Sequence, residues 1–184
     1  MSWPFLTIYI RERFDLPLTF VASILAIRSI AGLLNSFVAG PAADRFGRKW
    51  LIIASLFITG ASFYLMTRAT SIFAWIIVMG LYGAFQPVFR VGADAMIADI
   101  VPPEKRINAY SLIRVISNLG ISFGPLIGGF LAAVSYDRAF ISASIVQVIL
   151  GATAIFLIKE TLIKSIGVKK ERESKSSFGY TAIL

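Results

Sequence analysis

The chain has 184 residues, of which 57% are hydrophobic and only 15% are charged, and its net charge is +8. Soluble domains carry about 25% charged residues, so this composition excludes an ordinary soluble protein. Histidine and cysteine are both absent. This excludes thiolate and histidine-based catalysis and leaves only carboxylates for a metal site, so we predict no metal, no cofactor and no enzyme. The basic residues lie between apolar runs rather than on a solvated face, which favours a membrane protein over a nucleic-acid partner.

The first apolar stretch, residues 1–10, is too short to cross a membrane. A spanning helix needs ~20 apolar residues, and here a charged triplet follows at residues 11–13. We expect this stretch to be the outer end of a truncated first span. The alternative is a short interfacial anchor, which Trp3 and Tyr9 would suit. The stretch lacks the basic leading region and the cleavage site of a signal peptide.

Five further apolar runs are each long enough to span a membrane. They are expected at Leu18–Gly40, Trp50–Thr67, Ser71 to about Ala98, Ile107–Val134 and Ala139–Ile158. We therefore predict an all-α membrane protein. Its helical bundle would occupy residues 1–160, with five full spans and one partial span. The polar segment 161–184 would be a tail or a linker between bundles.

Lys and Arg are distributed unevenly between the two ends of these spans. Eleven of the eighteen lie on the side of the 40–49 loop and the carboxyl-terminal tail, four lie on the other side, and three lie within apolar runs. Lys and Arg concentrate in cytoplasmic loops. We therefore expect a multi-pass protein of the cell membrane whose 40–49 loop and tail are cytoplasmic.

The loop at residues 40–49 is expected to form a tight hairpin between two spans. Gly40 would let two backbones approach closely at the helix end, and Pro41 would discourage the helix from continuing. Gly47 can adopt the positive φ of a tight turn. Asp44 would cap a helix start or lie against a helix N-terminus, which stabilises a carboxylate by ~0.3–1 kcal/mol.

The basic residues of this loop have two expected partners. Arg45, Arg48 and Lys49 would bind anionic lipid headgroups, and they can also reach a carboxylate across the interface. Topology favours Asp99, at the same end of a later span. A pair of this kind, shielded by packed helices, would stabilise one conformation of the protein.

Two motifs resemble those of the major facilitator superfamily. Gly40-x-x-x-Asp44-Arg45-x-Gly47-Arg48-Lys49 is similar to the family's loop motif between the second and third helices. Gly120-Ile-Ser-Phe-Gly124-Pro125-Leu-Ile-Gly128-Gly129 is similar to the glycine-proline motif in the fifth helix of its drug–proton antiporters. The alternatives are a positive-inside hairpin for the first motif and a helix-packing stripe for the second.

This resemblance covers nearly the whole chain but only the amino-terminal half of a usual family member. Such members have twelve helices in two six-helix bundles, with substrate bound between the bundles. The resemblance therefore implies a six-helix amino-terminal bundle with a truncated first helix. It also implies a small-molecule substrate, protons as a coupling ion, and a second bundle as partner, either a missing half or another copy.

Four charged residues lie within the predicted spans: Arg28, Arg90, Asp94 and Arg114. Each costs ~2.5–3.5 kcal/mol at a helix centre, so such residues tend to face a cavity or a partner. Arg90 and Asp94 are four residues apart, the separation of an intrahelical pair. Together with Arg114 they would attract an anionic substrate, or Asp94 would carry a proton. The structural alternative is that they lock helices together or extend to water.

The leading functional hypothesis is a secondary transporter, of the multidrug efflux type, working by alternating access. Drug–proton antiporters carry an arginine ahead of a glycine in the fourth helix, and no arginine precedes Gly83 at residues 75–82. A uniporter or organic-anion transporter without proton coupling is therefore one alternative. A non-transporting fragment, or an assembly half that needs a second bundle, is another.

Overall fold

The computed structural model describes residues 3–161, and all of the secondary structure in this range is helical. Five of the helices, α2 to α6, are long and apolar enough to cross a membrane, which confirms the predicted all-α bundle. The elements are α1 (Trp3–Phe14), α2 (Leu18–Phe46), α3 (Arg48–Arg68), α4 (Ile72–Ile100), the 3-10 helix η1 (Pro103–Lys105), α5 (Arg106–Val134) and α6 (Tyr136–Leu157).

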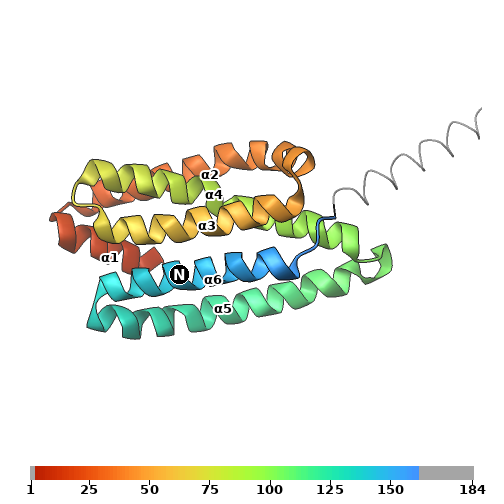
Figure 1. The fold of residues 1–184 in the computed structure, drawn as a ribbon. Helices are drawn as coiled ribbons and strands as arrows, with labels where there is room; N and C mark the ends of the chain where they lie inside the picture. The colour runs from red at the N-terminus through yellow and green to blue at the C-terminus, as the bar shows by residue number, and fades with distance from the viewer. Residues whose placement is uncertain (1–2, 162–184) are drawn as a thin grey trace, which may run out of the picture.

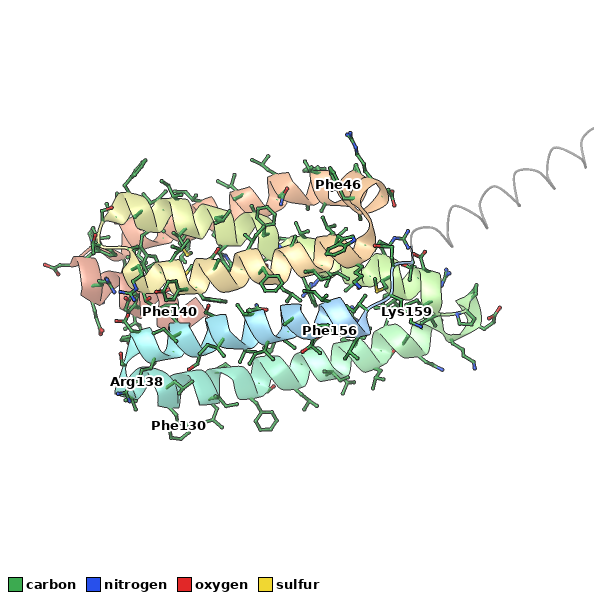
Figure 2. The ribbon with its side chains drawn as sticks, viewed as in Figure 1. Phe46, Phe130, Arg138, Phe140, Phe156 and Lys159 are labelled. Carbon is green, nitrogen blue, oxygen red and sulfur yellow. The ribbon has the colours of Figure 1, made fainter. Side chains whose placement is uncertain are left out.

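The helices run side by side, so their connections gather at two opposite ends (Figure 1). The α2–α3 turn, the α4–α5 connection and the end of α6 lie at one end, which we call the basic end. The turns between α1 and α2, α3 and α4, and α5 and α6 lie at the other. Figure 2 shows Phe46 and Lys159 at the basic end and Arg138 at the opposite end. The 40–49 loop and the residues after α6 therefore meet, as the predicted topology requires.

The predicted end of a helix at Gly40 is wrong. α2 continues through Pro41 to Phe46, and Gly47 alone separates it from α3. A proline removes one intrahelical hydrogen bond, but the alanines that follow it are the strongest helix formers and sustain the helix. The close approach expected at Gly40 is also wrong for the described residues, because a Cβ added there would meet nothing within 4 Å.

Two other predicted boundaries differ from the structure. α1 runs through the charged triplet to Phe14, and a positive φ of 48° at Asp15 ends it. Its 12 residues rise only about 18 Å, so it is not of spanning length. Its Ile10 is fully buried and Tyr9 is 5% exposed, so α1 packs into the bundle and is not a surface anchor. Likewise the turn predicted at 136–138 is helical, and only Ser135 separates α5 from α6.

Helices α2 and α4 approach most closely at Gly83. A Cβ on Gly83 would lie 2.3 Å from the carbonyl oxygen of Arg28, and one on Gly32 would lie 2.9 Å from the carbonyl oxygen of Gly83. The side chain of Asn35 donates a hydrogen bond of 2.7 Å to the carbonyl of Ala84. Small residues allow this backbone contact, and an interhelical hydrogen bond fixes its register.

The larger of two buried apolar clusters lies toward the end opposite the basic end, and a smaller one, which includes Ile52 and Met96, lies nearer the basic end. Trp75 is fully buried in the larger cluster, with ring centroids 5.5 Å from Tyr9 and 6.2 Å from Phe140, so aromatic side chains join α1, α4 and α6.

Helix α5 is different, because Gly128 is its only buried residue. Figure 2 shows Phe130 of α5 pointing away from the bundle. Most of α5 is therefore left uncovered by the described part of the chain.

Candidate functional site: a charged cluster at the basic end

Five residues from three parts of the chain form what we call the charged cluster: Arg48, Lys49, Asp99, Glu160 and Thr161. The first two open α3, Asp99 lies in the last turn of α4, and the last two follow α6. The cluster carries two positive and two negative side chains, so its charges balance. It joins three helix ends that are far apart in the sequence.

Glu160 binds the N-terminus of α3. Its carboxylate accepts hydrogen bonds from the backbone N–H groups of Arg48, at 3.1 Å, and Lys49, at 3.2 Å. These N–H groups have no partner within the helix, and the partial positive charge of a helix N-terminus favours an anion there. Gly47 makes this contact possible, because its φ is 92° and a Cβ on it would lie 2.5 Å from a Glu160 oxygen.

Arg48 connects α3 to α4. Its guanidinium forms an ion pair with Asp99, and the two side chains are only 11% and 14% exposed. It also donates to the carbonyl of Ala95 at 3.0 Å. The hydroxyl of Thr161 donates to the same carboxylate oxygen of Asp99, at 3.1 Å. The structure therefore brings Arg48 to Asp99 and links both to the segment after α6.

Lys49 and Arg45 have different surroundings. The Lys49 ammonium donates to the carbonyl of Ile155 near the end of α6, at 2.7 Å, so it too ties α3 to α6. Arg45 is exposed, and its guanidinium lies over the ring of Phe46 with its carbon 5.6 Å from the centroid. Of the two residues, only Lys49 belongs to the cluster.

Asp44 does not take the position predicted for it. It lies in the last turn of α2, where the helix dipole disfavours a carboxylate, and Glu160 occupies the N-terminus of α3 instead. Its side chain is 74% exposed and lies 3.8 Å from a guanidinium nitrogen of Arg48. An exposed pair of this kind contributes about 0–1 kcal/mol.

The charged residues within the spans do not gather into one cluster. Arg90, Asp94 and Arg114 are all exposed, and none of them enters an ion pair with another described residue. The predicted Arg90–Asp94 pair is therefore absent from the described chain, because four-residue spacing places two side chains on one face without forcing exposed groups together. The backbone carbonyl of Asp94 accepts a hydrogen bond of 3.1 Å from Tyr110 of α5.

Arg28 lies at the close approach of α2 and α4. It is half-buried, and its guanidinium lies over the ring of Tyr82, with its carbon 5.7 Å from the centroid. Its backbone and the first carbons of its side chain pack on Gly83. The face of an aromatic ring is a favourable neighbour for a cation away from water.

The glycine-proline motif on α5 is largely uncovered. Gly128 is buried and Gly129 is half-buried, whereas a Cβ added to Gly120 or Gly124 would meet nothing within 4 Å. Pro125 is exposed within the helix. For Gly120 and Gly124 the expected packing role is therefore not filled by any described part of this chain.

Sequence reasoning missed Glu160 and Thr161. Glu160 is the last residue of the predicted bundle and Thr161 the first of the predicted tail, and no partner was predicted for either. Residues 162–184 of the predicted tail lie outside the described residues. One signal was available. Glu160 follows the last span at the end where the 40–49 loop lies, and the same topological argument that favoured Asp99 applies to it.

Membrane-length helices that place a balanced charged cluster at one end define a multi-pass helical membrane protein. The family model for the Major Facilitator Superfamily matches residues 1–182. The chain therefore belongs to the Major Facilitator Superfamily of membrane transporters, as its two motifs indicated.

The relatives of this chain include antiporters and drug-resistance proteins. It is 28% identical over its whole length to a Na(+), Li(+), K(+)/H(+) antiporter of Planococcus maritimus and covers 44% of that protein. It is 33% identical to the class C tetracycline resistance protein of Escherichia coli, over 75% of this chain and 35% of the relative. It is 32% identical to multidrug resistance protein 2 of Bacillus subtilis (strain 168), over 76% of this chain and 35% of the relative. The chain thus spans less than half the length of these relatives.

Proposed function

We propose that this chain is one six-helix bundle of a secondary transporter that works by alternating access and exports small molecules. The charged cluster is the observation that carries the proposal. It ties the ends of α3, α4 and α6 together through a shielded ion pair and a helix-terminal carboxylate. Contacts of this kind can stabilise one of two packed conformations, and a transporter alternates between such conformations. The chain is proposed to be a transporter rather than an enzyme.

The proposed transporter needs a second bundle, either another copy of this chain or a missing half. Two observations support this part of the proposal. The chain covers 44% or less of the relatives described above, and Gly120 and Gly124 present bare helix backbone on the uncovered side of α5. Small residues of this kind let a neighbouring helix approach closely in a membrane.

Cysteine crosslinking tests this contact, because the chain has no cysteine of its own. Gly120→Cys should form covalent dimers on oxidation in membranes if the partner is a second copy. Phe156→Cys, at an 85% exposed position of α6, is the matched control and should remain monomeric. Equal yields from both variants would argue against α5 as the contact face. A monomer from both would exclude a second copy as the partner.

We further propose that the basic end faces the cytoplasm and that Asp94 carries a coupling proton. The excess of Lys and Arg at the basic end supports the orientation. Asp94 is an exposed carboxylate within α4, and such residues mark proton pathways in transporters. Asp94→Asn should abolish the pH dependence of substrate flux, whereas an unchanged pH dependence would assign Asp94 to structure. The second candidate is an organic-anion carrier without proton coupling, which exposed Arg90 and Arg114 would favour.

A further inference from the structure

The start of α3 and the end of α6 bring two lysines together at the basic end. The ammonium of Lys49, in the first turn of α3, donates to the carbonyl of Ile155 in the last turn of α6 at 2.7 Å. Lys159 comes shortly after the end of α6, and its neighbour Glu160 accepts from the backbone N–H of Lys49 at 3.2 Å. Lys159 is exposed, and Figure 2 shows it at the end of α6. The two lysines therefore share one surface, which we call the α3–α6 surface.

The acidic residues nearby are directed to other partners. The carboxylate of Glu160 is turned toward the N-terminus of α3, where it binds two backbone N–H groups. Asp99 pairs with Arg48 and is only 14% exposed, and Asp44 lies on α2, 3.8 Å from the same guanidinium. The Lys49 ammonium has three N–H donors, and its contact with α6 uses one of them. An anion from outside the protein can therefore accept from this surface.

Large apolar side chains border the two lysines. Trp50 follows Lys49 in α3, is 57% exposed, and has its ring centroid 5.8 Å from the Lys49 ammonium. Phe156 and Leu157, in the last turn of α6, are 85% and 76% exposed. A surface that combines cations with exposed apolar side chains suits a molecule that has an anionic head and apolar chains.

The α3–α6 surface lies at the depth of lipid headgroups. α3 has 21 residues and α6 has 22, so each rises about 32 Å, close to the ~30 Å thickness of the hydrocarbon core. The basic ends of both helices therefore lie at the boundary between acyl chains and headgroups. Tryptophan is enriched at this boundary, and basic pockets between membrane helices bind anionic headgroups.

We propose that the α3–α6 surface binds one anionic phospholipid. Its phosphate accepts hydrogen bonds from the ammonium groups of Lys49 and Lys159, and its acyl chains run along Trp50 and Phe156. The lipid joins the start of α3 to the end of α6 from the outside, where Glu160 joins them from within. This site goes beyond the proposed transport function and does not depend on it.

Native mass spectrometry of the full chain in detergent micelles tests the proposal. The chain is titrated with dioleoylphosphatidylglycerol or with dioleoylphosphatidylcholine, which have the same acyl chains and differ in headgroup charge. The first molecule of phosphatidylglycerol should bind roughly tenfold or more tightly than the first molecule of phosphatidylcholine, because each lysine near an anionic lipid strengthens binding about fivefold. Glycerol phosphate, which has the phosphate without acyl chains, should not displace the bound lipid.

Lysine variants locate the binding. Lys159→Gln should weaken phosphatidylglycerol binding about fivefold and leave phosphatidylcholine binding unchanged. Lys105→Gln is the matched control, because it removes the same charge from an exposed lysine of η1 at the same end and should change neither affinity. Lys49→Gln should also weaken binding, but it loses the contact with Ile155 as well, so Lys159→Gln is the decisive variant.

Three results would overturn the proposal. Equal affinities for the two lipids would show that this surface does not select an anionic headgroup. Equal effects of Lys159→Gln and Lys105→Gln would assign the preference to the overall charge of the basic end. Displacement by glycerol phosphate at the concentrations at which the lipid binds would make a free phosphate compound the ligand. Because the assay involves no flux, failure of the proposed transport function would leave these affinities unchanged.

Discussion

Replacing Glu160 by glutamine should release the N-terminus of α3. The Glu160 carboxylate accepts from the N–H groups of Arg48 and Lys49, and it also accepts from the N–H of Thr161 at 2.9 Å. Glutamine keeps one acceptor oxygen but turns an NH₂ group toward an N–H donor, and it loses the charge that the helix dipole favours. One lost charged hydrogen bond and the lost dipole interaction together amount to about 2–3 kcal/mol.

This loss predicts a large increase in local opening. About 2–3 kcal/mol corresponds to roughly 30- to 150-fold faster amide exchange at Arg48 and Lys49, provided that these amides exchange through local opening. Hydrogen–deuterium exchange read by mass spectrometry on peptides covering residues 47–51 measures it. Glu104→Gln is the matched control, because Glu104 is exposed in η1 at the same end and should leave this peptide unchanged. Equal exchange in the wild-type and Glu160→Gln chains would refute the reasoning.

Three further predictions follow from single contacts. Gly83→Ala should destabilise the fold by about 1–3 kcal/mol in reversible unfolding, because the added Cβ would meet the Arg28 carbonyl. In the control Gly80→Ala the added Cβ has nothing within 4 Å, so this change should be neutral or stabilise the fold by up to about 1 kcal/mol. Equal effects would contradict the close α2–α4 approach. Gly47→Ala should expose the α3 N-terminus to exchange as Glu160→Gln does, since both its positive φ and its Glu160 contact exclude a Cβ; wild-type exchange would count against this. Asp99→Asn should cost about 1.5–3 kcal/mol and Asp44→Asn under about 1 kcal/mol, measured in the same unfolding assay. The reverse order would show that Asp44 is the stronger partner of Arg48.

The existence and order of the helices could be predicted from the sequence because apolar runs of spanning length have few other structures available. Helix boundaries were less predictable. Pro41 and the charged triplet 11–13 suggested helix ends, but a single proline or a few charges near a membrane surface cost less than the hydrogen bonds of another turn, so α2 and α1 continue through them.

Partners of the charged residues were only partly predictable. The position of Asp99 near the 40–49 loop could be predicted from topology alone, because every second connection between helices lies at the same end of the bundle. The sequence could not show that Glu160, rather than Asp44, binds the N-terminus of α3, because this depends on which carboxylate the fold directs toward that helix end. The close contact of Gly83 with Arg28 could not be predicted either, since the sequence around a glycine does not show which neighbouring helix the glycine will contact.

Flux in proteoliposomes, measured as a function of protein copies per vesicle, tests the central claim most directly. The claim is that this chain forms one bundle of a two-bundle transporter. Vesicles with at most one copy should show no substrate flux driven by a pH gradient, and activity should require a second copy or an added partner bundle. Flux in vesicles that hold a single copy would contradict it.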